Sequence, residues 1–358
     1  MIPTYDKVHN HFKLNNKSYN RDELKEVAYS FIKEGSPSEK ALGDFLADWL
    51  DAKDYIKSKT SGTTGKPKII KIKKQAMVYS AIATGNYFGL KPKDRALHCL
   101  PTQFIAGKMM LVRAIILGLQ VDVIEPGTTL NFSSKKHYHF AAMIPMQVQQ
   151  NLKKLTHIKT LIVGGAPMSS ELIDQLQPLQ TKVYATYGMT ETITHIAIKK
   201  LNNFTNSESV SNTYYEVLPS IHISQDEREC LVIEAPKLSK EKITTNDVVK
   251  LHSEKTFEWL GRFDNVINSG GIKFFPEQIE EKLKGKISNR FFIASEEDDK
   301  LGEKLILVLE AVKNDLSNTV FKDLDAYEKP KKIYTVSKFS ETTSGKIQRL
   351  QTIAAINN

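Results

Sequence analysis

The spacing of hydrophobic residues predicts a chain that begins with helices and continues as alternating strands and helices. Residues 21–51 carry apolar side chains at helical spacing, interrupted at Gly35-Ser36-Pro37, which predicts two short helices with Ser36 or Ser38 capping the second. From about residue 69 to 200, short apolar runs alternate with helical stretches. Strands are expected at 97–100, 121–124, 160–163 and 182–186, and helices at 75–88, 105–119 and 169–176. This alternation is typical of an α/β sheet covered by helices.

The rest of the chain, from residue 202, is expected to complete this domain and then to form a second, smaller unit. The polar stretch 202–212 is expected to be a surface loop, and 213–260 has the alternation of β structure. Beyond it, the pattern predicts a helix opening at Pro276-Glu277 and ending at Gly285, strands near 290–295, 304–310 and 331–336, and a helix at 316–327. The predicted fold is therefore a large N-terminal α/β domain (1–260), a hinge (261–264) and a small C-terminal α+β domain (265–358).

Composition narrows the class of protein. The 358 residues are 41% hydrophobic and 25% charged, which is ordinary for a globular protein. With 50 basic and 41 acidic residues the net charge is +9, which favours anionic partners without choosing among them. Cys99 and Cys230 alone cannot form a disulfide framework, no apolar run reaches the length of a membrane span, and the start of the chain lacks a secretory signal. A cytoplasmic protein is expected.

The strongest local motif is a run of small and hydroxylated residues before two lysines at 60–68. Small residues let backbone N–H groups approach a polyphosphate, while hydroxyls and lysines supply further donors. It is not a Walker A loop, because Pro67 stands where that motif needs Ser or Thr. Taken alone, the run also fits a flexible linker. The candidate phosphate-binding residues are Thr60, Ser61, Gly62, Thr63, Thr64, Gly65 and Lys66.

Two further motifs lie at expected strand ends, where open α/β sheets bind ligands. One strand leads into Gly164-Gly165-Ala166-Pro167, and the next leads through Tyr187-Gly188-Met189 to Thr190 and Glu191. In the second motif an aromatic ring can lie against a base, a hydroxyl can bond phosphate and a carboxylate can hold a divalent cation. In isolation, Glu191 reads more simply as a surface acid.

The last two motifs lie beyond residue 260. They are 261–280, which contains Arg262, Asp264 and Gly270-Gly271, and 342–349, in which Lys346 follows Ser-Gly. Together and in this order, the motifs resemble the adenylate-forming superfamily of acyl-CoA synthetases, peptide-synthetase adenylation domains and luciferases. The resemblance covers about residues 60 to 350. The phosphate loop begins at residue 60, whereas longer relatives have a substantial extra region before it, which implies a shortened N-terminal subdomain.

The resemblance implies a role for each matched position. It places Tyr187 by adenine, Thr190 on phosphate and Glu191 on Mg²⁺, with 164–167 lining the adenine pocket. It places Asp247 and Arg262 on the ribose, although Asn246 stands where glycine is commoner. It also implies a hinge at Asp264, a CoA channel at Gly270 and Gly271, and an adenylation lysine at Lys346.

The implied reaction has two steps. An acid carboxylate attacks the α-phosphorus of ATP to give an acyl-adenylate and pyrophosphate, and a thiol, expected to be that of CoA, then displaces AMP. Mg²⁺ on Glu191, the loop donors and Lys346 would offset the repulsion between the two anions. In the second step the small domain is expected to rotate about the hinge and remove Lys346 from the site.

Acid selectivity is expected around 100–108 and 164–195. Phe104 stands where many relatives have histidine, and His195 follows Glu191 by four residues, although a structural histidine fits equally well. The helix 105–119 is apolar except for Lys108 and Arg113, which do not share a face, so at most one is expected in the acid pocket. Lys108 is the candidate, and for Arg113 a structural ion pair or a snorkelling side chain is the simpler interpretation.

The same motifs most resemble the o-succinylbenzoate–CoA ligases of bacterial menaquinone synthesis, whose acid is an aromatic dicarboxylate. We therefore expect o-succinylbenzoate, ATP and CoA as ligands. Alternatives are another aryl or short acyl acid, or a carrier-protein thiol. A nucleic-acid-binding protein is disfavoured, because basic residues are dispersed without aromatic interleaving. A regulatory relative without activity is disfavoured by the presence of Glu191, Arg262 and Lys346. An oligomer is possible but is not indicated by the sequence.

Overall fold

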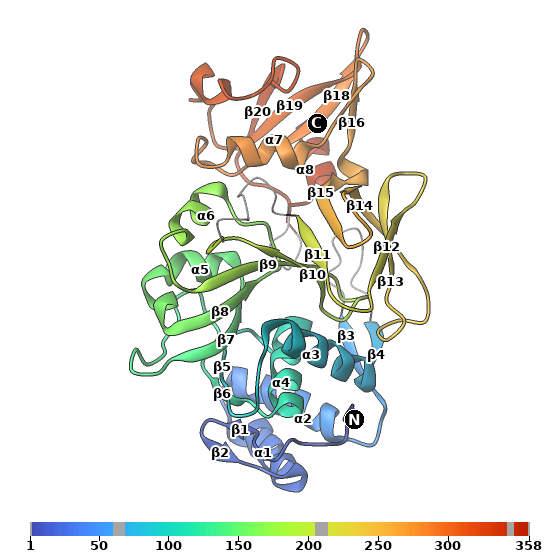
Figure 1. Cartoon of the computed structure of the whole chain (residues 1–358). Coiled ribbons are helices and arrows are strands. Elements are labelled where there is room, and N and C mark those ends of the chain that lie inside the picture. The colour runs from blue at the N-terminus through green and yellow to red at the C-terminus, as the bar shows by residue number, and fades with distance from the viewer. Residues whose placement is uncertain (1, 60–68, 205–213, 342–346, 357–358) are drawn as a thin grey trace.

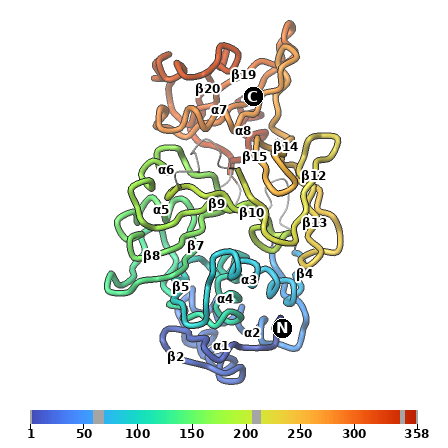
Figure 2. The backbone as a smooth tube through the Cα atoms, in the orientation of Figure 1, coloured from blue at the N-terminus to red at the C-terminus, as the bar shows by residue number. Residues whose placement is uncertain are grey.

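The computed structural model describes residues 2–59, 69–204, 214–341 and 347–356. The described residues form one large sheet with helices on both faces, and a smaller sheet at the end of the molecule where the chain finishes (Figure 1). The large sheet has the strand order β12-β13-β14-β15-β11-β10-β9-β8-β7-β5-β6-β1-β2. The chain runs from the helices at one end of the molecule to the small sheet at the other (Figure 2).

The centre of the large sheet is parallel. Its strands are β5 (Arg95–His98), β6 (Gln120–Val123), β7 (Tyr138–Met143), β8 (Ile158–Val163) and β9 (Lys182–Gly188). Successive side chains face opposite sides, so Ile162 joins one core cluster while Leu161 and Val163 join another. Burial on both faces explains why these strands read as short, nearly continuous apolar runs.

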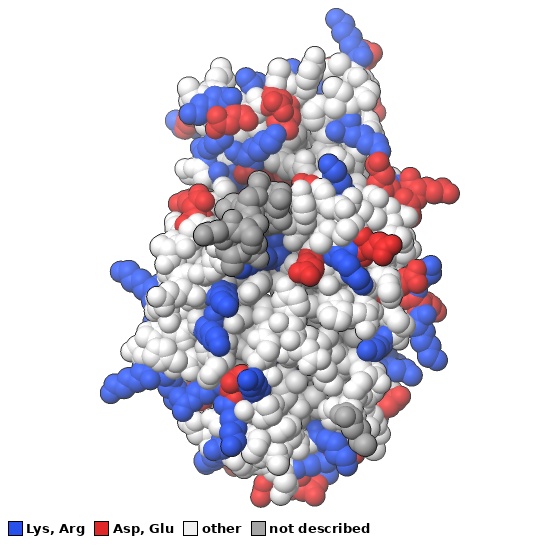
Figure 3. Space-filling view, in the orientation of Figure 1, with Lys and Arg blue, Asp and Glu red and all other residues white. Residues whose placement is uncertain are grey.

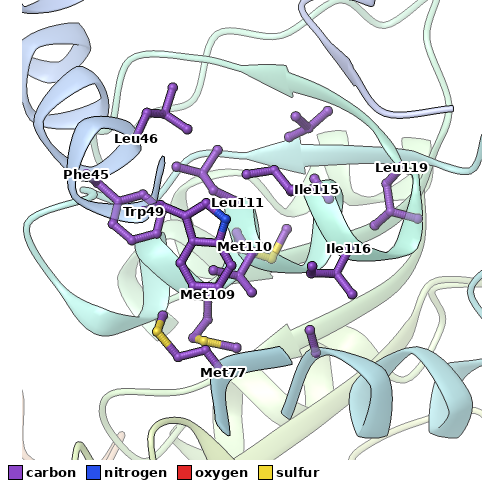
Figure 4. Close-up of a cluster of buried hydrophobic side chains, with 14 of the residues drawn as sticks. Phe45, Leu46, Trp49, Met77, Met109, Met110, Leu111, Ile115, Ile116 and Leu119 are labelled. Carbon is purple, nitrogen blue, oxygen red and sulfur yellow. The ribbon is translucent and has the colours of Figure 1, made fainter. Parts of the chain in front are cut away.

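Helices cover both faces. One face carries α1 (Arg21–Glu34), α2 (Pro37–Leu50), α3 (Lys74–Phe88) and α4 (Ile105–Leu117), and the other carries α5 (Pro145–Gln150), the 3-10 helix η1 (Leu152–His157) and α6 (Ser170–Leu176). In the first layer Trp49 of α2 lies among Met77 of α3 and Met109 of α4 (Figure 4). Each of α1 and α2 begins with a capping box, on Asn20 and on Ser36.

The edges of the large sheet are antiparallel. One edge ends in the small hairpin β1 (Lys13–Leu14) and β2 (Lys17–Ser18). The other edge consists of β10 (His195–Lys200), β11 (Tyr215–Val217), β12 (His222–Gln225), β13 (Cys230–Glu234), β14 (Ile243–Leu251) and β15 (Thr256–Arg262). A separate hairpin, β3 (Tyr55–Lys59) with β4 (Ile69–Lys73), flanks residues 60–68.

The small sheet starts after the 3-10 helix η3 (Phe263–Asn265). Its strands are β16 (Ile267–Ser269), β17 (Ile272–Phe274), β18 (Phe291–Asp298), β19 (Gly302–Glu310) and β20 (Lys332–Val336), packed with α7 (Pro276–Leu283), the 3-10 helix η4 (Asn318–Phe321) and α8 (Arg349–Ala354). Core residues lie on both of its faces. Within the described chain, no helix is long and apolar enough to cross a membrane.

The predicted mixed α/β class, with one large and one small unit, is confirmed by this architecture. The predicted helix at 316–327 is wrong: only the short 3-10 helix η4 forms, and Phe321 at its end and Leu324 in the turn after it pack in the core of the small sheet. The expected loop at 202–212 is described only to residue 204, and its first residue is not on the surface. Asn202 is fully buried and its amide donates to the carbonyls of Leu176 and Thr181.

Candidate active site

The ends of β8 and β9 form the floor of the candidate site. A Cβ added to Gly164 would lie 2.6 Å from the Thr186 hydroxyl, and one added to Gly188 would lie 2.3 Å from the Thr194 carbonyl oxygen. Both distances are far below normal contact, so a side chain at either position would force its neighbour to shift. Residues 165–167 follow β8 as an exposed segment. The structure therefore places the two predicted strand-end motifs side by side, since β8 pairs directly with β9.

The Asp247 carboxylate is the centre of a polar cluster formed with three other side chains. Its Oδ2 accepts a hydrogen bond from the Tyr187 hydroxyl at 2.6 Å, and its Oδ1 lies 3.2 Å from the Trp259 indole nitrogen and 3.4 Å from an Arg262 guanidinium nitrogen. The residue is 7% exposed. A carboxylate has about four acceptor sites, so three donors leave about one for a ligand hydroxyl. Tyr187, Asp247 and Arg262, predicted to hold adenosine, are thus brought together.

The Tyr187 side chain is held by its surroundings as well as by this bond. Its ring lies 5.2 Å from that of Phe257 and 5.8 Å from that of Tyr215. Burial, together with the negative charge of Asp247, raises the pKa of the phenol well above its usual value, so the hydroxyl remains a donor at neutral pH. Trp259 was not identified from the sequence, because its approach to Asp247 depends on the irregular pairing of β14 with β15.

The turn after β9 is tightly shaped. The Thr192 hydroxyl accepts from the Met189 amide and lies 2.7 Å from the Thr194 carbonyl oxygen and 3.0 Å from that of Met189, so its one proton has an acceptor at either. Ile193 has a φ of 68°, a left-handed conformation that a β-branched residue rarely adopts. Such strain persists only where the surroundings impose it and is often found at functional sites. Thr190 and Glu191 lie in this turn.

Glu191 fits the requirements of a Mg²⁺ ligand. Its side chain is exposed, and it makes no ion pair or hydrogen bond within the described residues. Proteins usually hold Mg²⁺ through one or two carboxylates together with substrate phosphates, so a single carboxylate at this position suffices. Among the described residues there is no cluster of three or more metal-binding side chains.

A buried arginine lies directly behind this turn. Arg113 of α4 is 1% exposed, and its terminal Nη2 donates to the Thr194 hydroxyl at 3.1 Å. Its Nε has no hydrogen-bond partner, and no carboxylate in the described chain lies within ion-pair distance of it. Burial lowers the pKa of Arg113 to about 9, which still leaves it charged at neutral pH. It neither snorkels to water nor forms the structural ion pair that was the simpler expectation.

His195 lies beside that arginine. The side chain is buried, with Nε2 3.3 Å from the Thr84 hydroxyl oxygen and Nδ1 3.4 Å from that of Thr194. Burial, and secondarily the charge of Arg113, lowers the pKa of His195 well below its usual value. The histidine is therefore neutral at physiological pH.

The other two predicted acid-pocket residues lie at the start of α4. Phe104 precedes the helix and is 60% exposed. Lys108 is half-buried, donates to the carbonyl oxygen of Lys57 at 3.2 Å and lies 6.0 Å from the Phe45 ring. Burial lowers the pKa of Lys108. The described contacts thus turn Lys108 toward β3 and α2, whereas they join His195 to Arg113.

The predicted hinge residue is tied to the nucleotide strand. Asp264 accepts a hydrogen bond of 2.8 Å from the Asn246 side chain, and Arg228 donates to Asn246 at 2.9 Å. Gly270 and Gly271 have φ values of 58° and 83° and form the two-residue turn between β16 and β17. Such a turn needs positive φ at both positions, which by itself accounts for glycine there. Their role in a CoA channel stays a prediction.

The predicted phosphate loop, Thr60 to Lys66, and Lys346 lie outside the described residues. The description of the chain resumes at residue 347, and shortly after it Arg349 ties the chain to the small domain. Its guanidinium donates to the Glu280 carboxylate at 2.8 Å and to the Ile293 carbonyl at 3.0 Å. Burial raises the pKa of Glu280 to about 7, although Arg349 counteracts this.

A cleft of about 290 Å³ separates the two units next to this point. It is lined by Ser169 and Glu171 at the start of α6 and by residues around the end of α7.

On the face shown in Figure 3, basic and acidic residues are interspersed around the molecule.

Comparison with known families gives the site its context. Residues 37–223 match the model of the family described as "AMP-binding enzyme", which is more than half of the chain. The chain belongs to the AMP-binding enzyme family. The predicted membership of the adenylate-forming superfamily, and with it the acid–thiol ligase class, is confirmed.

Relatives and solved structures of AMP-binding enzymes extend this similarity. The chain is 26% identical over 352 residues to a 2-succinylbenzoate–CoA ligase of Listeria monocytogenes, covering 90% of this chain and 74% of the relative. A crystal structure of an AMP-forming acyl-CoA synthetase/AMP-acid ligase II-like protein from Dyadobacter fermentans is 35% identical in sequence, with a TM-score of 0.60. The match covers 93% of this chain and 98% of that one. The chain also resembles the structure of o-succinylbenzoate CoA synthetase from Bacillus subtilis in complex with ATP and magnesium. The identity is 22% and the TM-score is 0.70, and the match covers 83% of this chain and 69% of that one.

Proposed function

We propose that the protein joins o-succinylbenzoate to CoA in menaquinone biosynthesis, using ATP and Mg²⁺ and passing through an acyl-adenylate. The nucleotide half of this proposal rests on the cluster of Tyr187, Asp247 and Arg262 beside the Glu191 turn. The thiol half rests on the class of enzyme and on relatives named as CoA ligases.

The observation that carries the choice of acid is the buried charge of Arg113. A buried cation without an anion costs several kcal/mol, because it has lost its hydration. Arg113 is 1% exposed, has no carboxylate partner in the described chain, and donates to the residue that precedes His195. An acid with a second carboxylate, beyond the one activated on ATP, supplies such an anion. A dicarboxylate therefore suits this pocket better than a fatty acid or benzoate.

The residues of the chain then take the following parts. Asp247 and Arg262 hold the ribose, with Tyr187 fixed beside the base. Glu191 would hold Mg²⁺, which would neutralise charge on the phosphates when bound. Thr190, the loop Thr60 to Lys66 and Lys346 are the proposed donors to the phosphates and to the developing charge. Phe104 lies at the mouth of the acid pocket.

Domain movement is part of the same proposal. We place the nucleotide-binding domain at 1–260, the hinge at 261–264 around Asp264, and the mobile domain at 265–358. In support, the last strand of the large sheet along the chain, β15, ends at Arg262, and the first strand of the small sheet, β16, begins at Ile267. Gly270 and Gly271, on the first turn of the small sheet, are proposed to line the CoA channel.

The test is pyrophosphate release from the purified protein with ATP and Mg²⁺, against o-succinylbenzoate, benzoate and fatty acids, each with and without CoA. We expect turnover with o-succinylbenzoate and formation of its CoA thioester. Turnover confined to another acid contradicts the proposed acid but keeps the adenylation chemistry. Thioester formation on a carrier-protein thiol in place of CoA contradicts the proposed acceptor. No turnover with any acid contradicts the function as a whole.

A further inference from the structure

His195 stands between two threonines in a chain of hydrogen bonds whose direction can be worked out. The Thr84 hydroxyl donates to the Ser80 carbonyl oxygen at 3.0 Å, so its proton is already used. Toward His195 the Thr84 oxygen can therefore only accept. The histidine nitrogen that faces it, Nε2 at 3.3 Å, must carry a proton.

The other end of the chain follows from the same reasoning. A neutral histidine with its proton on Nε2 has an acceptor at Nδ1, which lies 3.4 Å from the Thr194 hydroxyl oxygen. Thr194 then donates to His195 and its lone pairs remain for the Arg113 guanidinium at 3.1 Å. The sequence of bonds is Arg113 to Thr194, Thr194 to His195, His195 to Thr84, and Thr84 to Ser80.

The opposite tautomer does not fit this arrangement. A proton on Nδ1 would leave the Thr194 hydroxyl proton without its acceptor on His195 and would set the Nε2 lone pair against the Thr84 oxygen. A doubly protonated ring would place a second positive charge beside Arg113, the charged group that acts on His195. Burial and Arg113 both lower the pKa of His195, in agreement with a neutral ring.

We propose that His195 is a positioning residue: as its Nε2–H tautomer it fixes the Thr194 hydroxyl, which in turn aims the Arg113 guanidinium at the second carboxylate of the acid. This inference rests on the proposed function, because it assigns Arg113 to that carboxylate. The histidine itself is not required to touch the acid. The preference for a dicarboxylate thus depends on His195, which follows Thr194, the residue that contacts Arg113.

Two substitutions by amide residues test the two hydrogen bonds of His195 separately. In His195→Asn the side-chain oxygen reaches about as far as Nδ1 and accepts from Thr194, while the contact with Thr84 is lost. In His195→Gln the side-chain amide reaches about as far as Nε2 and donates to Thr84, while the contact with Thr194 is lost. His195→Leu removes both, and His222→Leu, on exposed β12, is the matched control.

The measurement is the KM and kcat of pyrophosphate release with o-succinylbenzoate and with its two monocarboxylate analogues, each lacking one carboxylate. We expect His195→Leu and His195→Gln to raise the KM for the dicarboxylate about tenfold, the size of one hydrogen bond to a charged group, with kcat and the analogue that keeps the activated carboxylate little changed. His195→Asn is expected to remain near the unmodified enzyme.

The outcomes separate this inference from the function on which it rests. If the unmodified enzyme does not prefer the dicarboxylate over its analogues, the assignment of Arg113 to an acid carboxylate fails. If it does, but His195→Gln and His195→Asn behave alike, the positioning role of His195 fails and the assignment of Arg113 stands. Thermal unfolding of each variant establishes that it is folded, and the Asn–Gln pair decides the question even if the Leu variant does not fold.

Discussion

Two charged side chains contact β9 or the turn that follows it, and their surroundings differ: Asp247 of β14 contacts Tyr187, and Arg113 of α4 contacts Thr194. The Asp247 carboxylate is surrounded by three donors, from Tyr187, Trp259 and Arg262. The Arg113 guanidinium is buried more deeply, at 1% exposure, and its acceptor within the described chain is one hydroxyl. The first site is electrostatically complete within the protein, and the second is not.

This difference has a physical consequence for each site. A carboxylate that accepts several hydrogen bonds stabilises the fold, and its removal leaves its donors unpaired. A buried cation without an anion destabilises the fold, and a folded chain keeps it only at a cost. We infer that the nucleotide side is largely formed before its ligand binds, whereas the acid side gains its missing charge from the acid. The predictions below test that contrast.

The largest expected effect is that of Asp247→Ala. Because it leaves Tyr187, Trp259 and Arg262 without their acceptor, we expect the free energy of unfolding to fall by about 2–4 kcal/mol and adenylation to fall about 100-fold. Chemical denaturation and pyrophosphate release measure the two. Glu258→Ala, which removes an exposed carboxylate from the adjacent strand, is the control and is expected to change stability by less than about 0.5 kcal/mol. Equal effects of the two substitutions would contradict the special position of Asp247.

The second prediction concerns acid pH. His98 is buried and its pKa is lowered to about 4, and the pKa of His195 beside Arg113 is lowered as well. In the unfolded chain both histidines titrate near 6.5. Between about pH 6.5 and 4 the unfolded state therefore binds protons that the native state does not, and stability falls as the pH falls. For His98 the loss approaches about 3 kcal/mol at pH 4.

Denaturation curves between pH 7 and 4 check this sign. His98→Gln is expected to give a shallower decline than the unmodified chain, because one of the two protonation differences is absent. A decline of unchanged slope would show that His98 is protonated in the native state at these pH values. The Asp247 cluster contains no histidine, and of the two histidines His195 is the one that lies beside Arg113.

The third prediction is smaller and concerns the turn that joins the two sites. In Gly188→Ala the added Cβ would lie 2.3 Å from the Thr194 carbonyl oxygen, which shifts the strand that carries Thr194 and His195. We expect a loss of about 1–3 kcal/mol in stability and a raised KM for the acid. In Gly127→Ala the nearest atom is 3.6 Å away, and no measurable change is expected. A Gly188→Ala variant as stable as Gly127→Ala would show that the turn is not fixed by this contact.

Much of the fold was predictable because its determinants are local. The periodicity of 75–88 and 105–119 matches α3 and α4, and the proline and glycine between residues 34 and 38 separate α1 from α2. The helix expected at 316–327 failed for the opposite reason. Its apolar residues have helical spacing, but Phe321 packs on the small sheet from the short 3-10 helix η4 and Leu324 from the turn after it, so tertiary packing overrides the local pattern.

The site was predictable where a motif is contiguous and unpredictable where it depends on pairing. The strand-end motif that contains Tyr187 and Glu191 can be recognised along the chain. The roles of Trp259, Thr84 and Thr194 depend on which strands and helices come together, for example on the approach of α3 to β10. The same holds for the choice between Lys108 and Arg113, since both lie on one apolar helix and only the packing shows which neighbours each has.

The most direct test of the central claim compares Arg113→Met with Lys108→Met. Both remove a cation from α4, but Arg113 is fully buried, whereas Lys108 is half-buried and donates to the Lys57 carbonyl oxygen. Neither forms an ion pair with a carboxylate of the described chain. For each variant, the free energy of unfolding and the kcat/KM ratio of o-succinylbenzoate to the monocarboxylate analogue would be measured. We predict that Arg113→Met is as stable as the unmodified chain or more stable by about 1–4 kcal/mol, yet loses its preference for the dicarboxylate. Loss of that preference in Lys108→Met, with Arg113→Met unchanged, would contradict the account.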